Sequence, residues 1–367
     1  MKIGVLTSSR ADFGIYKQLL KEISELIDFE IIAFGTHLSK FHGFTIDEIR
    51  SEFTVPIHQI NTVLANDDVN SIASSYGLTV QKFADFWNNS SFDLVLCLGD
   101  RYEMNAALQA GIPYNVKFAH FHGGEESLGA IDNIYRHQIT LASQIHFTAT
   151  KDYYNRVVEL IGTSEGVYNV GSIALDKISK LKLLSNDEFR NKYNIPNEDY
   201  ILVTIHPETK NVDANKKYSL EIYEALKNLG KDYHIVITMP NSDTLGSIYR
   251  NAWAELKTVF PNSVTLIENF GAENYYAAMK YSKLLLGNSS SGIIEAASFN
   301  KYVINVGDRQ KGRIRSSNTL DVDFNFNRII AKVKEINSLD QYQGDNKYFK
   351  ENSIQKVINI IKDYDGF

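Results

Sequence analysis

Short apolar runs of strand length alternate along this chain with longer segments whose apolar residues recur at helical spacing. Continuously apolar strands separated by amphipathic helices are typical of a parallel sheet that is covered on both faces. The pattern therefore predicts repeated βα units. In the first half the expected strands are residues 3–6, 30–34, 93–98, 118–121, 145–148 and a short one at 167–172.

The same rhythm restarts after a polar stretch rich in Asn and Lys at residues 180–199. The second set of expected strands is 202–205, 234–238, 264–267, 284–286 and 303–305. Because a chain of 367 residues exceeds what one hydrophobic core usually organises, two domains are expected. We predict an α/β protein of two doubly wound, Rossmann-like domains that face each other across a cleft.

The domain boundaries follow from the polar stretch that separates the two sets of expected strands. Residues 1–172 form the expected N-terminal α/β domain, and residues 173–350 the C-terminal one. The last segment has apolar residues at helical spacing, so a helix over 351–365 is expected to pack back on the first domain.

Charge and composition exclude several classes of protein. A net charge of −6 argues against a nucleic-acid backbone as the main partner. No run approaches the roughly 18 apolar residues of a membrane span, and residues 1–7 do not resemble a signal peptide, so we expect a cytoplasmic protein with no membrane partner. Cys97 is the only cysteine, which excludes an internal disulfide and any multi-cysteine metal site.

Ionisable, hydroxyl and glycine residues gather where the expected strands end. Ligands of open α/β sheets bind at the carboxyl ends of the strands, so these residues are candidates for a site. The strand-end segments of the first half are 7–12, 35–37, 99–101 and 120–125, and those of the second half are 206–208, 239–242, 287–292 and 307–309.

The segment GNSSSG at residues 287–292 opens an expected helix. Small residues let a phosphate approach the N–H groups of a helix start. The same sequence would also fit an ordinary serine N-cap that binds no ligand. Glu295 could accept hydrogen bonds from a ribose. Arg309, Lys311, Arg313 and Arg315 could hold a diphosphate or form a solvated basic loop. Glycine fingerprints of dinucleotide-binding and P-loop proteins are absent.

Several groups able to transfer protons share one region of the first half. Asp100 ends a strand, where it could be either a catalytic group or a helix cap. The neighbouring strand end and the segment after it bring His120, His122, Glu125 and Asp132. Their combination favours acid–base chemistry, and the His206-Pro207-Glu208 run would face them from the second domain.

The same residues suggest a rival function. His120 and His122 have H-x-H spacing and, with Asp100 or Asp132, could bind a divalent metal ion for hydrolysis. Loss of activity in EDTA would indicate such a metallohydrolase.

Taken in order, the motifs of this chain resemble those of the hydrolysing UDP-N-acetylglucosamine 2-epimerases of sialic acid biosynthesis. The resemblance covers nearly the whole chain. The motifs are TSSRADFG at 7–14, GDRYE at 99–103, HFHGGE at 120–125, AID at 130–132, RH at 136–137, IHP at 205–207, PN at 240–241, GNSSSG at 287–292, Glu295 and RQKGR at 309–313.

This resemblance implies a fold like that of the GT-B glycosyltransferases and an enzyme that needs no cofactor or metal. It implies that UDP binds mainly to the second domain. The implied catalytic residues are Asp100, Asp132, His206, His122 and Glu125. The implied residues for substrate and UDP are Arg10, Arg101, His37, Asn241, Ser289, Ser290, Glu295 and Arg313.

Two departures from the family pattern bear on the reaction. Many relatives carry a catalytic Glu where this chain has His122, so either His122 or Glu125 would be the second acid–base group. His206-Pro207-Glu208 differs from the run of the non-hydrolysing relatives, which favours release of the free sugar.

The resemblance leaves the nucleotide-sugar substrate open. The first expected substrate is UDP-N-acetylglucosamine, which would be converted to UDP and N-acetylmannosamine. The alternative substrate is UDP-2,4-diacetamido-2,4,6-trideoxyglucose of the legionaminic acid pathway. A GT-B glycosyltransferase would differ from both by releasing UDP only with an acceptor. The family also implies a homodimer, or a tetramer, as the oligomeric state.

Overall fold

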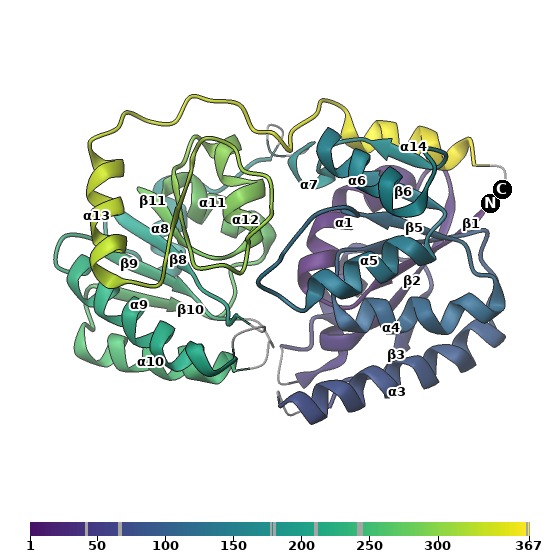
Figure 1. Cartoon of the computed structure of the whole chain (residues 1–367), viewed down its shortest axis with the longest axis horizontal. Helices are drawn as coiled ribbons and strands as arrows, with labels where there is room; N and C mark the ends of the chain where they lie inside the picture. The colour runs from purple at the N-terminus through teal and green to yellow at the C-terminus, as the bar shows by residue number, and fades with distance from the viewer. Residues whose placement is uncertain are drawn as a thin grey trace. The chain divides into compact units, whose positions relative to one another are not determined.

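The computed structural model describes residues 1–40, 43–64, 68–176, 178, 181–208, 212–240, 245–364 and 366. Its contacts divide the chain into two compact units, which Figure 1 shows. Unit 1 comprises Met1–Glu125, Asp132–Lys177 and Tyr348–Phe367, and unit 2 comprises Glu126–Ile131 and Ile178–Lys347. The C-terminal segment therefore belongs to the same unit as the N-terminus.

Unit 1 is built on a seven-stranded sheet with the order β3-β2-β1-β4-β5-β6-β7. Every pair of neighbouring strands is parallel. The strands are β1 (Lys2–Thr7), β2 (Asp28–Phe34), β3 (Ile57–Ile60), β4 (Leu94–Leu98), β5 (Phe118–Phe121), β6 (Ile145–Thr148) and β7 (Val167–Asn169).

Helices cover both faces of this sheet, and each face has its own hydrophobic core. One core joins β-strand residues such as Ile3 and Val5 to α1, α2 and α14, and the other joins Leu6 and Val95 to α3 and α4. The helices of unit 1 are α1 (Arg10–Ile23), α2 (Ile46–Glu52), α3 (Val69–Asn88), α4 (Tyr102–Gly111), α5 (Asp132–Ala142), α6 (Lys151–Ile161), α7 (Ile173–Asp176) and α14 (Ser353–Lys362), with 3₁₀ turns η1 (Gly35–Leu38) and η3 (Ile112–Tyr114).

Unit 2 has a six-stranded parallel sheet with the order β10-β9-β8-β11-β12-β13. Its strands are β8 (Tyr200–Thr204), β9 (His234–Thr238), β10 (Val264–Ile267), β11 (Leu284–Gly287), β12 (Val303–Val306) and β13 (Thr319–Val322). Its helices are α8 (Asn186–Tyr193), α9 (Asn215–Leu229), α10 (Gly246–Val259), α11 (Ala272–Tyr281), α12 (Ser290–Ile294) and α13 (Phe326–Asn337), with 3₁₀ turns η5 (Val212–Ala214) and η6 (Ala296–Phe299).

These two parallel sheets confirm the predicted α/β class of the chain. The central strands coincide with the apolar runs because they are buried on both sides, as the fully buried Leu94–Leu98 illustrates. The prediction omitted β3 and β13, each at the edge of its sheet. Both edge strands are only partly buried, so their sequences, IHQI and TLDV, lack a continuous apolar run.

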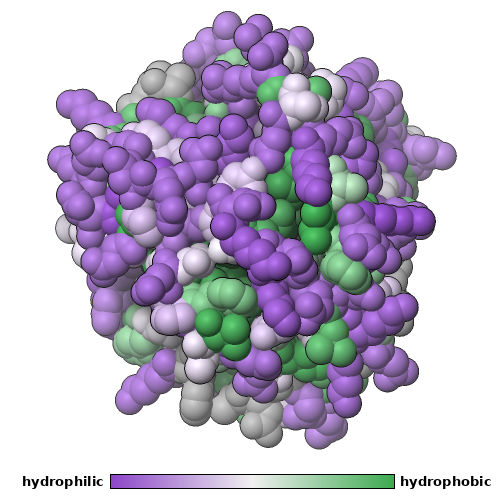
Figure 2. Space-filling model, turned by 90° about the vertical axis from the view of Figure 1, so that its left-hand side faces the viewer, coloured by the Kyte–Doolittle hydropathy of each residue, from purple (hydrophilic) through white to green (hydrophobic). Residues whose placement is uncertain are grey.

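Figure 2 shows one face of the molecule, and most of that face is hydrophilic. On the face in Figure 2 the hydrophobic residues form small patches that hydrophilic residues separate. Among the described residues, no helix is both long and apolar enough to cross a membrane.

The strand orders define where each sheet can bind a ligand. Chain connections reverse direction between β1 and β4 in unit 1 and between β8 and β11 in unit 2. In open α/β sheets, ligands bind beyond the carboxyl ends of the strands at such a switch point. The segments after these four strands are therefore the first places to look for function.

Candidate active site

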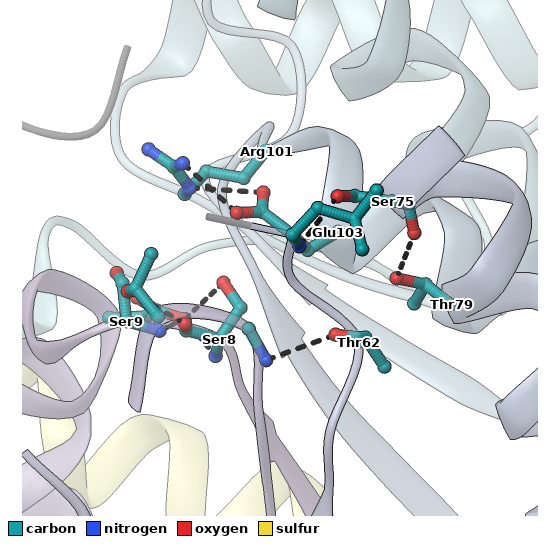
Figure 3. A network of polar contacts seen from close by, with 11 residues as sticks. Ser8, Ser9, Thr62, Ser75, Thr79, Arg101 and Glu103 are labelled. Atoms are coloured by element: carbon teal, nitrogen blue, oxygen red, sulfur yellow. Dashed lines mark hydrogen bonds and ion pairs between the residues drawn. The ribbon is translucent and has the colours of Figure 1, made fainter. Parts of the chain in front are cut away.

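The loop after β1 is fixed by a buried carboxylate. Asp12 Oδ2 accepts hydrogen bonds from the Ser8 N–H at 2.7 Å, the Ser8 hydroxyl at 3.0 Å and the Ser9 N–H at 3.2 Å. Figure 3 shows Ser8 and Ser9 within the surrounding polar network. Since α1 begins at Arg10, this network fixes the backbone that carries the predicted substrate-binding arginine.

His37, in the turn after β2, lies beside this loop. Its Nε2 is 2.9 Å from the Thr7 hydroxyl oxygen, and its Nδ1 is 2.8 Å from the Thr45 hydroxyl oxygen. Burial is the largest effect on the ring and lowers the pKa of His37. The structure thus places His37 as a buried imidazole that ties together Thr7 and Thr45.

Arg101, after β4, is oriented by a buried partner. Its guanidinium donates to the Glu103 carboxylate from Nε at 3.2 Å and from Nη2 at 3.1 Å, as Figure 3 shows. Glu103 is fully buried, whereas the Arg101 side chain keeps 22% of its surface exposed. This two-point contact gives Arg101 a defined direction, which suits recognition of an anionic or oxygen-rich ligand.

Arg136 on α5 connects several of the predicted proton-transfer groups. Its Nη2 pairs with Asp100 Oδ2, and its Nη1 donates to the His122 carbonyl oxygen at 3.1 Å. The same Nη1 lies 3.7 Å from Glu125 Oε2. Asp132, the first residue of α5, lies four positions before Arg136 and thus on the same side of that helix. The structure therefore brings Asp100, His122 and Glu125 together around one buried guanidinium.

His122 and Glu125 form a hydrogen-bonded pair. His122 Nδ1 is 2.6 Å from Glu125 Oε1. His122 follows β5 with a positive φ of 66°, so its side chain does not continue the alternation of the strand. Gly124 has a φ of 76°, and a Cβ there would approach the Tyr153 carbonyl oxygen to 2.5 Å. The two glycines of the HFHGGE motif thus include one that the turn requires.

His120 points to different partners from His122. Its Nε2 is 2.8 Å from the Gly99 carbonyl oxygen, and its Nδ1 is 3.2 Å from the Thr140 hydroxyl oxygen. Burial lowers the pKa of His120 to about 3, so the ring is neutral at ordinary pH. The rival metal site assumed that these two histidines share a strand face, but β5 ends at Phe121. Over the part of the chain that the structure describes, no group of three or more His, Cys, Asp or Glu is arranged to hold a metal ion.

In unit 2, His206 is held at the switch point by the side chain of Asn288. The Asn288 Oδ1 accepts from the His206 N–H at 2.7 Å, and the Asn288 Nδ2 donates to the His206 carbonyl oxygen at 2.8 Å. These bonds connect the segment after β8 to the segment after β11. They place the predicted leaving-group histidine next to the predicted phosphate-binding turn.

Helix α12 begins beside this pair. Ser289 is its N-cap and accepts from the Ser291 N–H at 3.4 Å, while the Ser291 hydroxyl lies 2.9 Å from both the Ser289 and Tyr275 hydroxyls. Ser290 is the first residue of the helix. Gly287, just before this turn, leaves no room for a side chain, because a Cβ would lie 1.9 Å from the Thr204 carbonyl oxygen.

The basic loop after β12 closes over the same turn. Arg309 Nη1 and Gln310 Nε2 both donate to the Asn288 carbonyl oxygen, at 3.1 and 2.9 Å. Arg313 is 6% exposed and Glu295 8% exposed, so both predicted UDP contacts are largely buried. Asn241, another predicted contact, lies outside the described residues.

Sequence reasoning gave Glu208 no role of its own, yet Glu208 organises this loop. Glu208 Oε1 accepts from the N–H groups of Asp308 at 2.6 Å and Arg309 at 3.2 Å. Gly307 permits this approach, because a Cβ there would lie 2.3 Å from Glu208 Oε1. The only sequence signal was the acidic residue in the strand-end run His206-Pro207-Glu208. Arg136 was similarly visible only as part of the RH motif.

Two parallel α/β units with polar clusters at their switch points define an architecture of the GT-B type. The crystal structure of the UDP-GlcNAc 2-epimerase from Neisseria meningitidis bound to UDP-GlcNAc is similar, with a TM-score of 0.82 and 19% sequence identity. The similarity covers 99% of this chain and 100% of that one. At this identity the likeness establishes the fold, which confirms the predicted GT-B-like class.

The family is established by the sequence itself. The model of the UDP-N-acetylglucosamine 2-epimerase family matches residues 21–362, and the chain belongs to that family of enzymes.

Two relatives match over nearly their whole length. The UDP-N,N'-diacetylbacillosamine 2-epimerase (hydrolyzing) of Legionella pneumophila is 34% identical over 98% of this chain and 95% of the relative. The polysialic acid biosynthesis protein P7 of Escherichia coli is 31% identical over 99% of this chain and 94% of the relative. The predicted family membership is thereby confirmed.

Proposed function

We propose that this enzyme is a hydrolysing 2-epimerase of a UDP-linked 2-acetamido sugar, which releases UDP and the free sugar inverted at C2. The observation that carries the proposal is the cluster of Asp100, His122 and Glu125 around Arg136 in a chain of this family. Inversion at C2 requires one group that removes a proton from carbon and one that returns a proton. A cluster of two carboxylates and an imidazole supplies groups suited to both tasks.

The proposed reaction has two stages. In the first, the bond from C1 to the UDP oxygen breaks, the C2 proton moves to an enzyme base, and a 2-acetamidoglucal forms. In the second, a proton adds to C2 from the opposite face, water adds its oxygen at C1, and the proton lost from that water returns to the enzyme. The sum is the nucleotide sugar plus water giving UDP and the 2-epimer.

Unit 2 supplies the proposed UDP site. Ser289 and Ser290 offer hydroxyl and N–H groups for the diphosphate, and Arg313 adds positive charge. Glu295 would accept hydrogen bonds from the ribose, and His206 would assist the leaving diphosphate. From unit 1, Arg10, Arg101 and His37 are proposed substrate contacts, and Asp132 is a second proton-transfer candidate.

UDP-N-acetylglucosamine is the first candidate substrate, giving N-acetylmannosamine for sialic acid biosynthesis. The second candidate is UDP-2,4-diacetamido-2,4,6-trideoxyglucose, which is also called UDP-N,N'-diacetylbacillosamine. It is favoured by the 34% identity to the Legionella pneumophila enzyme named for it. The two substrates differ at C4 and C6 of the sugar, away from the reacting carbons, so one catalytic cluster can serve either. Turnover of each by the purified enzyme distinguishes them.

The decisive experiment follows the hydrogen at C2. Reaction in D₂O should place deuterium at C2 of the released sugar, which proton NMR detects as loss of the H2 signal while free UDP appears. A simple hydrolase would leave the C2 hydrogen in place, and either a gluco product or a manno product with a full H2 signal would contradict the proposal.

Two controls address the remaining rivals. We expect full activity in EDTA, because arginines and a helix start stabilise the leaving diphosphate, whereas a metallohydrolase would be inhibited. We expect UDP release from the donor alone, whereas a glycosyltransferase would need an acceptor sugar.

We also propose a cytoplasmic homodimer for this enzyme. Sedimentation as a monomer at micromolar concentration would contradict the oligomeric state.

A further inference from the structure

Gln310, in the basic loop after β12, is held at both its backbone and its side chain. Its carbonyl oxygen accepts from the Arg313 N–H and from Arg315 Nη2, each at 3.2 Å. Its side-chain Nε2 donates to the Asn288 carbonyl oxygen at 2.9 Å. The residue is 2% exposed, so its side-chain amide is buried in one defined place.

The chemistry of the Asn288 contact fixes which way round this amide is. A backbone carbonyl can only accept a hydrogen bond, so the nitrogen of the Gln310 amide must face it. The oxygen, Oε1, remains as an acceptor, and no group among the described residues donates to it although it is buried. Buried polar atoms of native proteins nearly always have a hydrogen-bond partner, so Oε1 is suited to a donor that comes from a ligand.

The anchor of this amide belongs to the candidate active site of unit 2. Through its side chain Asn288 bonds the backbone of His206 at 2.7 and 2.8 Å. The next residue, Ser289, is the N-cap of α12 and a proposed contact of the diphosphate. Gln310 is therefore attached directly to the turn that begins the proposed diphosphate site.

The chemistry of a nucleotide sugar limits which of its groups could donate to Oε1. The diphosphate has only acceptor oxygens at neutral pH, so it offers Oε1 no hydrogen. On the nucleoside side of the diphosphate the nearest donors are the ribose hydroxyls, for which Glu295 is the proposed acceptor. On the other side is the sugar, and both candidate substrates carry the N–H of the 2-acetamido group and the hydroxyl at C3. The sugar is therefore the part of the substrate that suits this acceptor.

We propose that Gln310 is a substrate-binding residue that recognises the sugar, and that Oε1 accepts a hydrogen bond from one of its N–H or O–H groups. This inference rests on the proposed function and adds a contact that UDP alone cannot make. Once the C1–O bond to UDP has broken and the free sugar has left, the remaining UDP lacks this contact. Gln310 thus makes the substrate bind more tightly than the product UDP.

The first test compares two ligands in Gln310→Met, which nearly keeps the size of the side chain and removes both polar atoms. One ligand is UDP, and the other is a UDP-N-acetylglucosamine analogue in which CH₂ replaces the oxygen between C1 and phosphorus, so that it cannot be cleaved. If the diacetamido substrate is the one turned over, its analogue is used instead. By calorimetry the analogue should bind about 3–10-fold more weakly than to wild type, while UDP affinity stays within about twofold.

Gln310→Met also loses the Nε2 bond to Asn288, so a second variant separates this support from the sugar contact. Gln310→Glu keeps an acceptor and loses the donor. Its negative charge beside the diphosphate should weaken both ligands, but the preference for the analogue over UDP should remain at least as large as in wild type. Gln355→Met, the same change at an exposed position of α14, is the matched control and should bind both ligands as wild type does.

Steady-state kinetics give a second measure of the same preference. In Gln310→Met the ratio of the UDP inhibition constant to the KM of the substrate should fall by about the same factor as the analogue affinity. A residue that only supports the turn would weaken UDP and substrate together and leave this ratio unchanged.

The outcomes tell the two proposals apart. If Gln310→Met weakens both ligands equally, or neither, Gln310 does not bind the sugar, and its Oε1 is satisfied by water or its role is to support the turn. If the wild-type enzyme binds no UDP, or places no deuterium at C2, the proposed function itself fails.

Discussion

One carboxylate oxygen of Glu208 accepts hydrogen bonds from the backbone N–H groups of both Asp308 and Arg309, at 2.6 and 3.2 Å. These residues follow two different strands of unit 2, β8 and β12. The carboxylate therefore fixes the start of the basic loop that carries Arg313. Burial is the largest influence on this group and raises the pKa of Glu208 above its ordinary value of 4.5.

Replacing Glu208 with Gln should change how stability depends on pH. A raised pKa in the folded state means that the contribution of Glu208 to stability is largest at low pH and is lost as the pH rises through that raised value. Because Gln keeps an acceptor without a charge, the Tm of Glu208→Gln relative to wild type should increase between about pH 4 and pH 7. Thermal denaturation across this range measures it.

Glu208→Ala is the matched comparison, since it leaves the two N–H groups without their acceptor. It should be less stable than Glu208→Gln by about 1–3 kcal/mol at every pH, because neither variant titrates at this position. A difference between wild type and Glu208→Gln that does not vary with pH would contradict the burial argument.

Asp100→Asn should reduce kcat by about 10²–10⁴-fold and leave UDP affinity nearly unchanged, because the amide cannot act as the base. Steady-state kinetics and calorimetry with UDP measure the two quantities. Asp47→Asn, at a position whose side chain is 70% exposed on α2, is the matched control and should behave as wild type. Near-normal turnover by Asp100→Asn would assign Asp100 to structure instead.

Arg313→Ala should weaken UDP binding by roughly 10–100-fold, the effect of losing charge-assisted hydrogen bonds worth about 1.5–3 kcal/mol. Ser290→Ala should weaken it less, since a neutral hydrogen bond contributes about 0.5–1.5 kcal/mol. Arg328→Ala, whose side chain is 67% exposed in the same unit, is the control. Wild-type UDP affinity in both test variants would place the diphosphate elsewhere.

Acidification should destabilise unit 1 through His146. Burial lowers the pKa of His146 from 6.5 to about 4, so the unfolded chain binds a proton that the folded chain does not. The stability that this neutral ring contributes is present above pH 6.5 and is lost as the pH falls toward 4. In His146→Phe the decrease in Tm between pH 7 and pH 4 should be smaller than in wild type. Equal slopes in the two proteins would mean that other groups control the acid transition.

Much of the fold could be predicted because the buried strands consist of apolar residues, which are visible in the sequence. Central strands such as Leu94–Leu98 are covered on both faces and consist only of apolar residues. Edge strands such as Ile57–Ile60 are only partly buried. Because this strand contains His58 and Gln59, its sequence resembles that of a loop. The strands that the prediction omitted are therefore those that are partly buried and partly exposed.

The candidate site was predictable in its location and not in its internal contacts. Polar residues at strand ends point to the carboxyl edge of a sheet, which is how Asp100 and His122 were identified. Which side chain pairs with which depends on helix placement, and Asp100 and Arg136 are 36 positions apart. The His122 and Glu125 pair depends on a left-handed backbone at His122, which residue types alone do not specify.

The return of α14 to unit 1 bears on how the chain acquires its structure during synthesis. Ile354, Val357, Ile358 and Ile361 are buried in the same core as Ile3 and Val5. A nascent chain that has emerged from the ribosome only as far as β7 still exposes the apolar surface that these four residues will cover. Unit 1 would then mature after unit 2, although its sequence begins first, and chains cut before α14 should depend on chaperones or aggregate.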